Sequence, residues 1–396
     1  MKKKRLVELD ILRGFAVMVM ILVTSPGNWA FTYSQMQHAA WHGWTFADFV
    51  FPDFLFGVGM ALGLTFGRSL DPAGDRKTFW LKVLRRVVGL ILLGLALNGF
   101  YYLAGMLGTP SAGPDDTVRF RIPGVLQRIA FAYLIAVLVV LATCVRSSDG
   151  PVRPRPVAIG VVIAVILAGY WAMLTFVPVP GAGPGDLSIA GNLPGYIDRQ
   201  IFSSQHMWQL GAETWRGPVY YDPEGILATL PASTNVLFGV LAVGIWQWDG
   251  RKRIVLLAGI GLALIAAALL LDPVFPINKK IWTSTFAMLT SGLSFIALLI
   301  VAGLLRAGLR SLLWPLKVFG GNAILAFSIS IALAAFGAVP FSFGGDPRPL
   351  MQRGFELASS VIASPYLASL AYAVTATAFV LLLIYPLHRK RVHLRL

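Results

Sequence analysis

Histidine and aspartate side chains gather in one short segment, QMQHAAWHGWTFADFVFP, residues 35–52. His38 and His42 are four residues apart, and Asp48 follows where a strongly apolar stretch begins. An imidazole with a pKa near neutrality can act as a base toward an amine or a hydroxyl, or can carry an acyl group itself. A carboxylate that accepts a hydrogen bond from the ring would orient it. The segment therefore predicts acid–base or acyl-transfer chemistry.

Two simpler interpretations apply to the same residues. Asp48 follows Thr45 and has the position of an aspartate that caps the positive end of a helix, an interpretation as good as the catalytic one. His38 and His42 have the spacing of metal ligands on a helix, but HAAWH lacks the glutamate of a zinc protease. We therefore predict no metal.

Polar groups at the starts or in the middle of three other apolar segments are further candidates. In RFRIPGVLQR, Arg121 and Arg128 are seven residues apart and so share a helical face. Either would clamp an anion or extend to lipid headgroups, and Gln127 lies beside them. In YYDPEGILATL, Asp222 and Glu224 would cap a helix, bind an amine or hold Arg121.

Asn322 in FGGNAILAF is a polar group beside two glycines, which favours a close backbone approach or an interhelical hydrogen bond. Asp53 lies deeper than Asp48 in the same apolar stretch, and we expect a buried partner such as an arginine for it. These groups need a scaffold that holds them at one place.

Composition identifies that scaffold as a membrane protein. The chain is 57% hydrophobic and 13% charged, and its mean hydropathy is +0.72. We predict an all-α, polytopic protein with about ten transmembrane helices. They centre near residues 11–31, 44–66, 86–104, 123–145, 156–177, 224–246, 254–271, 282–304, 316–336 and 363–385.

Basic residues indicate the orientation. Most of the 33 lysines and arginines, beginning with Lys2 to Arg5, fall on one side if both termini are cytoplasmic, which places His38 outside. The net charge of +15 then reflects topology and anionic lipid, with no nucleic-acid partner. We expect one transmembrane domain, 1–396, with a long extracytoplasmic loop at about 178–222 and an uncleaved first helix.

The motifs together resemble the transmembrane acetyltransferase family of heparan-alpha-glucosaminide N-acetyltransferase and its bacterial relatives. LDILRG, HAAWHGWTFADFVFPDFLFGVGM, RIPGVLQR, YDPEG and GGNAIL carry the resemblance, which spans nearly the whole chain. It implies transfer of an acetyl group from cytosolic acetyl-CoA to the amine of a glucosamine-like sugar across the membrane. Thr24 and Asp53 depart from the family pattern, in which an asparagine and an apolar residue are usual.

The resemblance assigns roles to the candidate residues. His38, in the H-A-x-W motif, and Asp48, in A-D-x-V-F-P, are predicted to be catalytic. The residues predicted to bind the substrate are Trp41, Arg121, Gln127, Arg128, Asp222, Glu224 and Asn322. At the inner face, Asp10 and Arg13, an expected i,i+3 pair, with Arg85 and Arg86 are predicted to bind acetyl-CoA, whose phosphates need cations.

Several alternatives remain open on the sequence. The acyl group would pass to the acceptor directly, or first to His38. The LDILRG start also resembles acyltransferases that modify hydroxyls of surface or cell-wall glycans. A small-molecule transporter would place polar residues in its spans too, although no repeated halves are visible, and a scaffold protein would tolerate changes at His38. We expect a bacterial cytoplasmic membrane as location, and a homodimer is reasonable because small residues are abundant.

Overall fold

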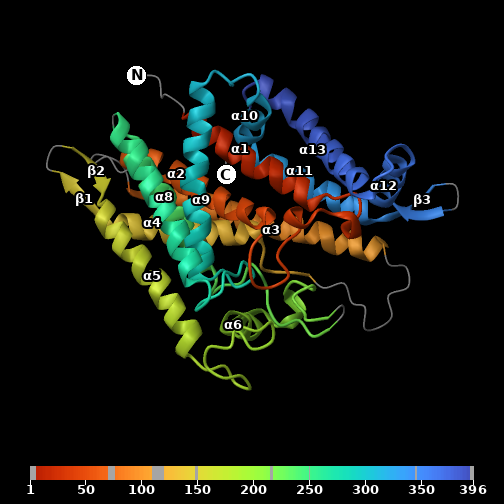
Figure 1. Cartoon of the computed structure of the whole chain (residues 1–396), viewed down its shortest axis with the longest axis horizontal. Coiled ribbons are helices and arrows are strands. Elements are labelled where there is room, and N and C mark those ends of the chain that lie inside the picture. The colour runs from red at the N-terminus through yellow and green to blue at the C-terminus, as the bar shows by residue number, and fades with distance from the viewer. Residues whose placement is uncertain are drawn as a thin grey trace.

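The computed structural model describes residues 6–69, 76–108, 120–147, 150–214, 217–248, 250–343 and 346–392. Helices dominate this part of the chain (Figure 1). The α-helices are α1 (Val7–Thr24), α2 (Phe46–Ser69), α3 (Arg76–Gly108), α4 (Val125–Thr143), α5 (Pro156–Phe176), α6 (Leu193–Phe202), α7 (Thr229–Trp246), α8 (Arg251–Leu271), α9 (Ser284–Arg306), α10 (Trp314–Gly321), α11 (Ala323–Ala338), α12 (Leu350–Val361) and α13 (Pro365–Arg389).

Short elements connect these helices. The 3₁₀ turns are η1 (Trp29–Phe31), η2 (Ser34–Met36) and η3 (Ser204–His206). Two antiparallel hairpins pair β1 (Cys144–Ser147) with β2 (Gly150–Pro154), and β3 (Pro340–Phe343) with β4 (Asp346–Pro349). The basic residues Lys2 to Arg5, on which the predicted orientation partly rests, lie outside the described residues.

The all-α, polytopic fold class is confirmed. In the described part, eight helices are long and apolar enough to cross a membrane, and α10 with α11 makes a ninth if that bent pair is one span. Helix α1 is 18 residues long and ends at Thr24 instead of 31, because Pro26 disfavours helical geometry in the residue before it.

The predicted single helix at 316–336 is wrong. The chain bends by 88° between α10 and α11, and Asn322 ends one helix and precedes the other with φ −132° and ψ 43°. Backbone packing explains the bend, since a Cβ on Gly320 would lie 1.7 Å from the Asp10 carbonyl oxygen and a Cβ on Gly14 1.7 Å from that of Leu316. Only glycines allow α10 and α1 to approach so closely, and α11 leaves that contact at Asn322.

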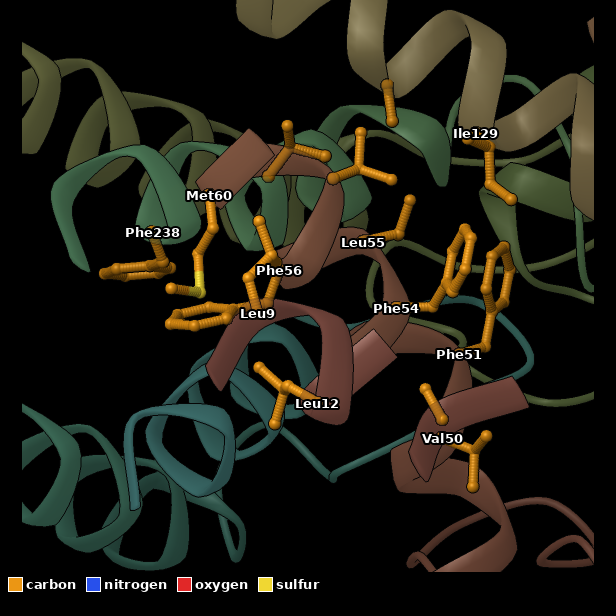
Figure 2. Packing of buried hydrophobic residues seen from close by; sticks show 14 of the residues in the cluster. Leu9, Leu12, Val50, Phe51, Phe54, Leu55, Phe56, Met60, Ile129 and Phe238 are labelled. Carbon is orange, nitrogen blue, oxygen red and sulfur yellow. The ribbon is translucent and has the colours of Figure 1, made fainter. Parts of the chain in front are cut away.

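Helices α2 and α7 form the centre of the bundle. In each helix, 83% of the most apolar 18-residue stretch is buried. Figure 2 shows Phe51, Phe54, Leu55 and Phe56 of α2 among side chains of α1, α4 and α7. The Phe56 ring also meets the Phe295 ring of α9 edge to face at 5.1 Å between centroids. An element buried on all sides gives rigid support to whatever its first turn carries.

Glycines set the distance between α2 and α7. A Cβ on Gly239 of α7 would lie 2.0 Å from the Phe56 carbonyl oxygen, and a Cβ on Gly59 of α2 would lie 1.8 Å from that of Val236. The clashing atoms belong to backbone, so they cannot move without separating the two helices.

We therefore expect Gly239→Ala to destabilise the protein by about 1 to 3 kcal/mol, the usual effect of overpacking. The thermal unfolding midpoint in detergent measures it. Gly244→Ala, in the same helix, is the matched control, because its Cβ would meet no atom within 4 Å. Equal midpoints for the two variants would show that α2 and α7 can separate without loss.

The outer helices show the opposite pattern. Only 22% of the apolar window of α3, 28% of that of α5 and 17% of that of α8 is buried, so most of their apolar side chains face outward. Surfaces of this kind suit a lipid solvent.

A layer of non-spanning chain covers one end of the bundle. It runs between α5 and α7, contains α6 and η3, and lies below the ends of α8 and α9 in Figure 1. Asn192 caps α6, because its side-chain oxygen accepts a hydrogen bond from the Gly195 amide at 2.7 Å. A small apolar core anchors the layer, formed by Tyr170, Leu174, Val179, Leu193, Phe275 and Ile281.

Candidate active site

A cavity of about 820 Å³ lies where this layer meets the bundle. Its wall combines the end of α3, the start of α4, the segment around residue 208, the turn between α8 and α9, and one side of α11. The polar lining residues include Thr24, His38, Asn98, Tyr101, Tyr102, Arg121, Gln127, Gln209, Glu224, Lys279 and Lys280. Such a space suits a small organic ligand.

His38 and Asp48 form a hydrogen-bonded pair in this wall. The Nδ1 of His38 lies 2.8 Å from Oδ1 of Asp48, which is fully buried, and the imidazole keeps 40% of its surface accessible. A carboxylate only accepts hydrogen bonds, so Nδ1 carries the proton. In the neutral ring the unprotonated Nε2 is then the free base, as general-base chemistry requires.

Asp48 also starts α2. Its Oδ2 accepts hydrogen bonds from the amides of Ala39 and Thr45, both at 3.0 Å, and lies 3.1 Å from the Thr45 hydroxyl. A side chain that reaches back to the residue before the first helical turn forms half of a capping box. The catalytic and the capping interpretations of Asp48 therefore both describe its contacts, one for each carboxylate oxygen.

Lys279 is the third member of this cluster, and sequence reasoning missed it. Its Nζ lies 3.3 Å from Oδ1 of Asp48, and 2.9 and 3.1 Å from Nδ1 and Nε2 of His38, and the residue is only 9% exposed. Because Nδ1–H donates to Asp48, the ammonium can donate to Nε2 and to the carboxylate. The cluster thus brings one cation, one imidazole and one anion together at the cavity.

Burial lowers the pKa of His38, and the Lys279 ammonium lowers it further, while the hydrogen bond and charge of Asp48 oppose the shift. Burial also lowers the pKa of Lys279 itself, against the opposing effect of Asp48. A His38 pKa below its usual value keeps the imidazole neutral at neutral pH.

Arg121 lies between Asp222 and Glu224, as one of the three interpretations expects. Its Nε and Nη2 donate to the two Asp222 oxygens at 2.9 and 2.5 Å, and Nη2 also donates to Glu224. Burial lowers the pKa of Arg121, but the two carboxylates outweigh that effect and raise it above its ordinary value. The three side chains fix the start of the 222–228 segment to the α3–α4 connection.

The shared helical face predicted for Arg121 and Arg128 is wrong. Helix α4 begins only at Val125, because Pro123 and Gly124 precede it and Gly124 is extended with φ 175°. Arg128 is 1% exposed, donates to the Gly225 carbonyl at 3.0 Å and stacks over Trp282 at 4.9 Å. It lies behind the cavity wall, so a role in substrate binding stays a prediction.

The other predicted binding residues take different places. Gln127 lines the cavity and donates to the Ile122 carbonyl at 2.9 Å. Trp41 donates through its indole N–H to the Leu187 carbonyl at 2.8 Å and packs on Tyr221 at 4.9 Å between centroids, so it holds the covering layer. Asn322, 1% exposed, marks the α10–α11 bend. Their roles in binding stay predictions.

No cation pairs with Asp53 in the part of the chain that the structure describes, so the expected arginine partner is wrong there. Its side chain is fully buried in α2, and neither carboxyl oxygen has a hydrogen-bond partner among the described residues. The facing surface of α9 presents a hydroxyl, that of Ser294, instead of a basic group.

The predicted inner residues lie near the amino ends of α1 and α3. Asp10 is 6% exposed, and the Arg13 guanidinium stands over the Phe54 ring at 5.9 Å. Arg86 stacks on Tyr133 of α4 at 4.6 Å, and Arg85 is exposed. Between Phe54 and the main cavity lies a small void of about 10 Å³, which shares Val125, Leu126 and Phe327 with the cavity wall.

Two lysines in the α8–α9 turn carry a signal that sequence reasoning could have used. INKKIWTST places adjacent lysines in a segment predicted to lie outside, against the general preference of basic residues for the cytoplasmic side. Basic residues on the opposite side are therefore candidates for a specific contact. The structure shows such a contact for Lys279, whose ammonium lies against His38.

Comparison with known proteins identifies relatives of this chain. Residues 5–176 match the family model described as heparan-alpha-glucosaminide N-acetyltransferase, catalytic. The human heparan-alpha-glucosaminide N-acetyltransferase is 31% identical over 332 residues, which are 75% of this chain and 48% of the relative. The mouse protein of the same name is 29% identical over 334 residues, 75% of this chain and 49% of the relative.

The chain therefore spans about half the length of the curated relatives it matches. The matched part holds His38 and Arg121, which line the cavity, and Asp48, which is hydrogen-bonded to His38. The resemblance found in the sequence motifs is confirmed, and the chain belongs to the heparan-alpha-glucosaminide N-acetyltransferase family.

Proposed function

We propose that this protein is a transmembrane acetyltransferase that moves an acetyl group from cytosolic acetyl-CoA to the amine of a terminal, glucosamine-like sugar on the extracytoplasmic side. The observation that carries the proposal is the His38–Asp48–Lys279 cluster, which faces a cavity of about 820 Å³ in a chain of this family. A multi-pass location in a bacterial cytoplasmic membrane belongs to the same proposal.

His38 acts as the base in this proposal. Its Nε2 accepts a proton from the ammonium of the sugar, and the freed amine attacks the thioester carbon of acetyl-CoA. The carbon–sulfur bond breaks and the acetyl group stays on nitrogen as an amide. The nitrogen gives up its second proton, and the leaving thiolate of CoA takes up that proton. Asp48 keeps Nδ1–H in place, so the proton acceptor is always Nε2.

Lys279 has two electrostatic roles in this scheme. Its ammonium lies 3.1 Å from Nε2, so it stands next to the point where the amine and the thioester meet. The carbonyl oxygen gains negative charge as the amine attacks, and a buried cation beside it lowers the energy of that state. The same charge favours the neutral, proton-accepting form of His38.

The donor needs a path from the other side of the membrane. The nucleotide of CoA carries several negative charges and stays in water, where Arg13, Arg85 and Arg86 would pair with its phosphates. Only the neutral pantetheine arm needs to enter the bundle. Residues of α1, α2, α4 and α11 line the small void beside Phe54, and these helices would have to separate to admit the arm.

Direct transfer and transfer through acetylated His38 both fit the cluster. Exchange of isotope label between free CoA and acetyl-CoA in the absence of acceptor separates the two routes. Exchange requires that the acetyl group leave CoA reversibly and stay on the protein. Its absence in an active preparation identifies direct transfer.

The test of the function is CoA release by the purified protein in detergent, with acetyl-CoA as donor. Glucosamine-dependent release of CoA, with N-acetylglucosamine as product, is the expected result. Sugars in which a hydroxyl replaces the amine form the control series, because an O-acetyltransferase would use them. Product from the hydroxyl series alone would replace the amine acceptor by a hydroxyl, and absence of any acetylated product would contradict the proposal.

The pH profile follows from the lowered pKa of His38. Protonated His38 cannot accept a proton, so kcat/KM is lost as pH falls through this pKa, and the inflection should lie below 6.5. Lys279→Met removes a charge that lowers the pKa, so the inflection should move to higher pH. Lys279→Arg keeps the charge and should keep the native inflection. A native inflection above 6.5, or none of these differences, would contradict the assignment.

A further inference from the structure

Lys280 is a buried cation that the proposed reaction does not use. The residue is 8% exposed and lines the cavity next to Lys279. Asn278 holds the turn that carries both lysines, because its side-chain oxygen accepts from the Ile281 amide at 3.1 Å and its carbonyl accepts from the Thr283 amide at 3.0 Å. The fixed turn thus presents Lys280 to the cavity before any ligand arrives.

Among the described residues that line the cavity, the other charged groups have partners of opposite charge. Arg121 pairs with Asp222 and Glu224, and Lys279 lies 3.3 Å from Asp48. Lys280 has neither an ion pair nor a hydrogen bond through its ammonium among the described residues, and its Nζ stands 4.8 Å from the centroid of the Trp208 ring. The ring holds the ammonium by a cation–π contact without neutralising it.

An unmatched ammonium in a cavity wall affects which ligands can bind. Burial lowers the pKa of Lys280 to about 8, so most of the protein still carries this charge at neutral pH. An acceptor that brings only an ammonium group toward the cavity is repelled by it. An acceptor that also carries an anion replaces that repulsion by an ion pair, and the ion pair gains strength from the partial exclusion of water.

We infer that the natural acceptor carries an anionic group, a carboxylate or a phosphate, in addition to its amine, and that Lys280 pairs with that group. The inference rests on the proposed function, because it describes the acceptor of the same site. Lys280 follows Lys279, which contacts His38. The anion therefore belongs on the amino sugar itself or on the unit joined to it.

Three acceptors test this inference with native protein: glucosamine, muramic acid, which adds a carboxylate, and glucosamine 6-phosphate. We expect kcat/KM for at least one anionic acceptor to exceed that for glucosamine by about tenfold. Lys280→Gln should abolish most of this preference, and Lys280→Arg should keep it. Lys252→Gln, at the exposed start of α8, is the matched control and should keep the native preference.

Carboxylate and phosphate are separated by which of the two acceptors gains. The inference is overturned if kcat/KM of native protein for glucosamine equals that for both anionic sugars, or if the preference survives in Lys280→Gln. The proposed function stands in either case. If no acceptor is acetylated, the proposed function fails, and calorimetric binding of the two anionic sugars decides the inference. Weaker binding to Lys280→Gln than to Lys252→Gln supports it, and equal binding overturns it.

Discussion

His38→Ala should lower glucosamine-dependent CoA release by about 10²- to 10⁴-fold, the usual contribution of a general base. The variant loses the only imidazole that lines the cavity in the described residues, and with it Nε2, the proton acceptor. The side chain is 40% accessible and fills no core position, so the protein should still fold. CoA release by native and variant protein at equal concentration is the measurement.

His42→Ala is the matched control for this experiment. His42 lies four residues further along but does not line the cavity, and its ring nitrogen is 3.4 Å from the Asn278 amide nitrogen. Its loss should leave turnover close to native. Persistence of native turnover in His38→Ala would remove His38 from the reaction, and a collapse in both variants would point to the loop instead of the base.

Arg121→Leu should destabilise the protein by about 3 to 5 kcal/mol, because it leaves two buried carboxylates without their cation. The Asp222 side chain is fully buried and that of Glu224 is 8% exposed. The guanidinium also connects the α3–α4 connection to the start of the α7 segment, so the cavity should lose its shape. The thermal midpoint in detergent and CoA release measure the two effects.

A compensated variant separates lost charge from lost shape. Replacing Asp222 by asparagine and Glu224 by glutamine in the Arg121→Leu background removes both unpaired charges, so much of the lost stability should return. Activity should not return, since the fork of hydrogen bonds is still absent. An Arg121→Leu protein as stable as native would show that water solvates the two carboxylates well enough to replace the cation.

The fold was largely predictable because hydrophobicity alone defines a membrane helix. Long apolar runs separated by Pro, Gly and basic residues predict helices at the positions of α2 to α5, α7 to α9 and α13. The bend at Asn322 could not be read in the same way. It depends on the contact of Gly14 and Gly320 with backbone carbonyls of another helix, which hydropathy does not report.

The candidate site likewise has a part that the sequence predicted and a part that only tertiary packing produces. His38 with Asp48, and Arg121 with Asp222 and Glu224, are brought together as expected, since each group lies beside a helix start at the same end of the bundle. Lys279 enters from a turn more than 200 residues away in sequence, and its contact with His38 is a product of tertiary packing. The helical face predicted to be shared by Arg121 and Arg128 was wrong because Pro123 and Gly124 delay the start of α4 to Val125, which leaves Arg121 outside the helix.

Asp48 and Lys280 differ in how freely they can change over generations. Asp48 starts α2 with one oxygen and holds His38 with the other, so a substitution there harms folding and chemistry together. Lys280 makes no bond with its ammonium that the described fold depends on. If Lys280 pairs with the acceptor as inferred, a substitution at position 280 changes the preferred acceptor and leaves helix α2 and the His38–Asp48 pair unaltered.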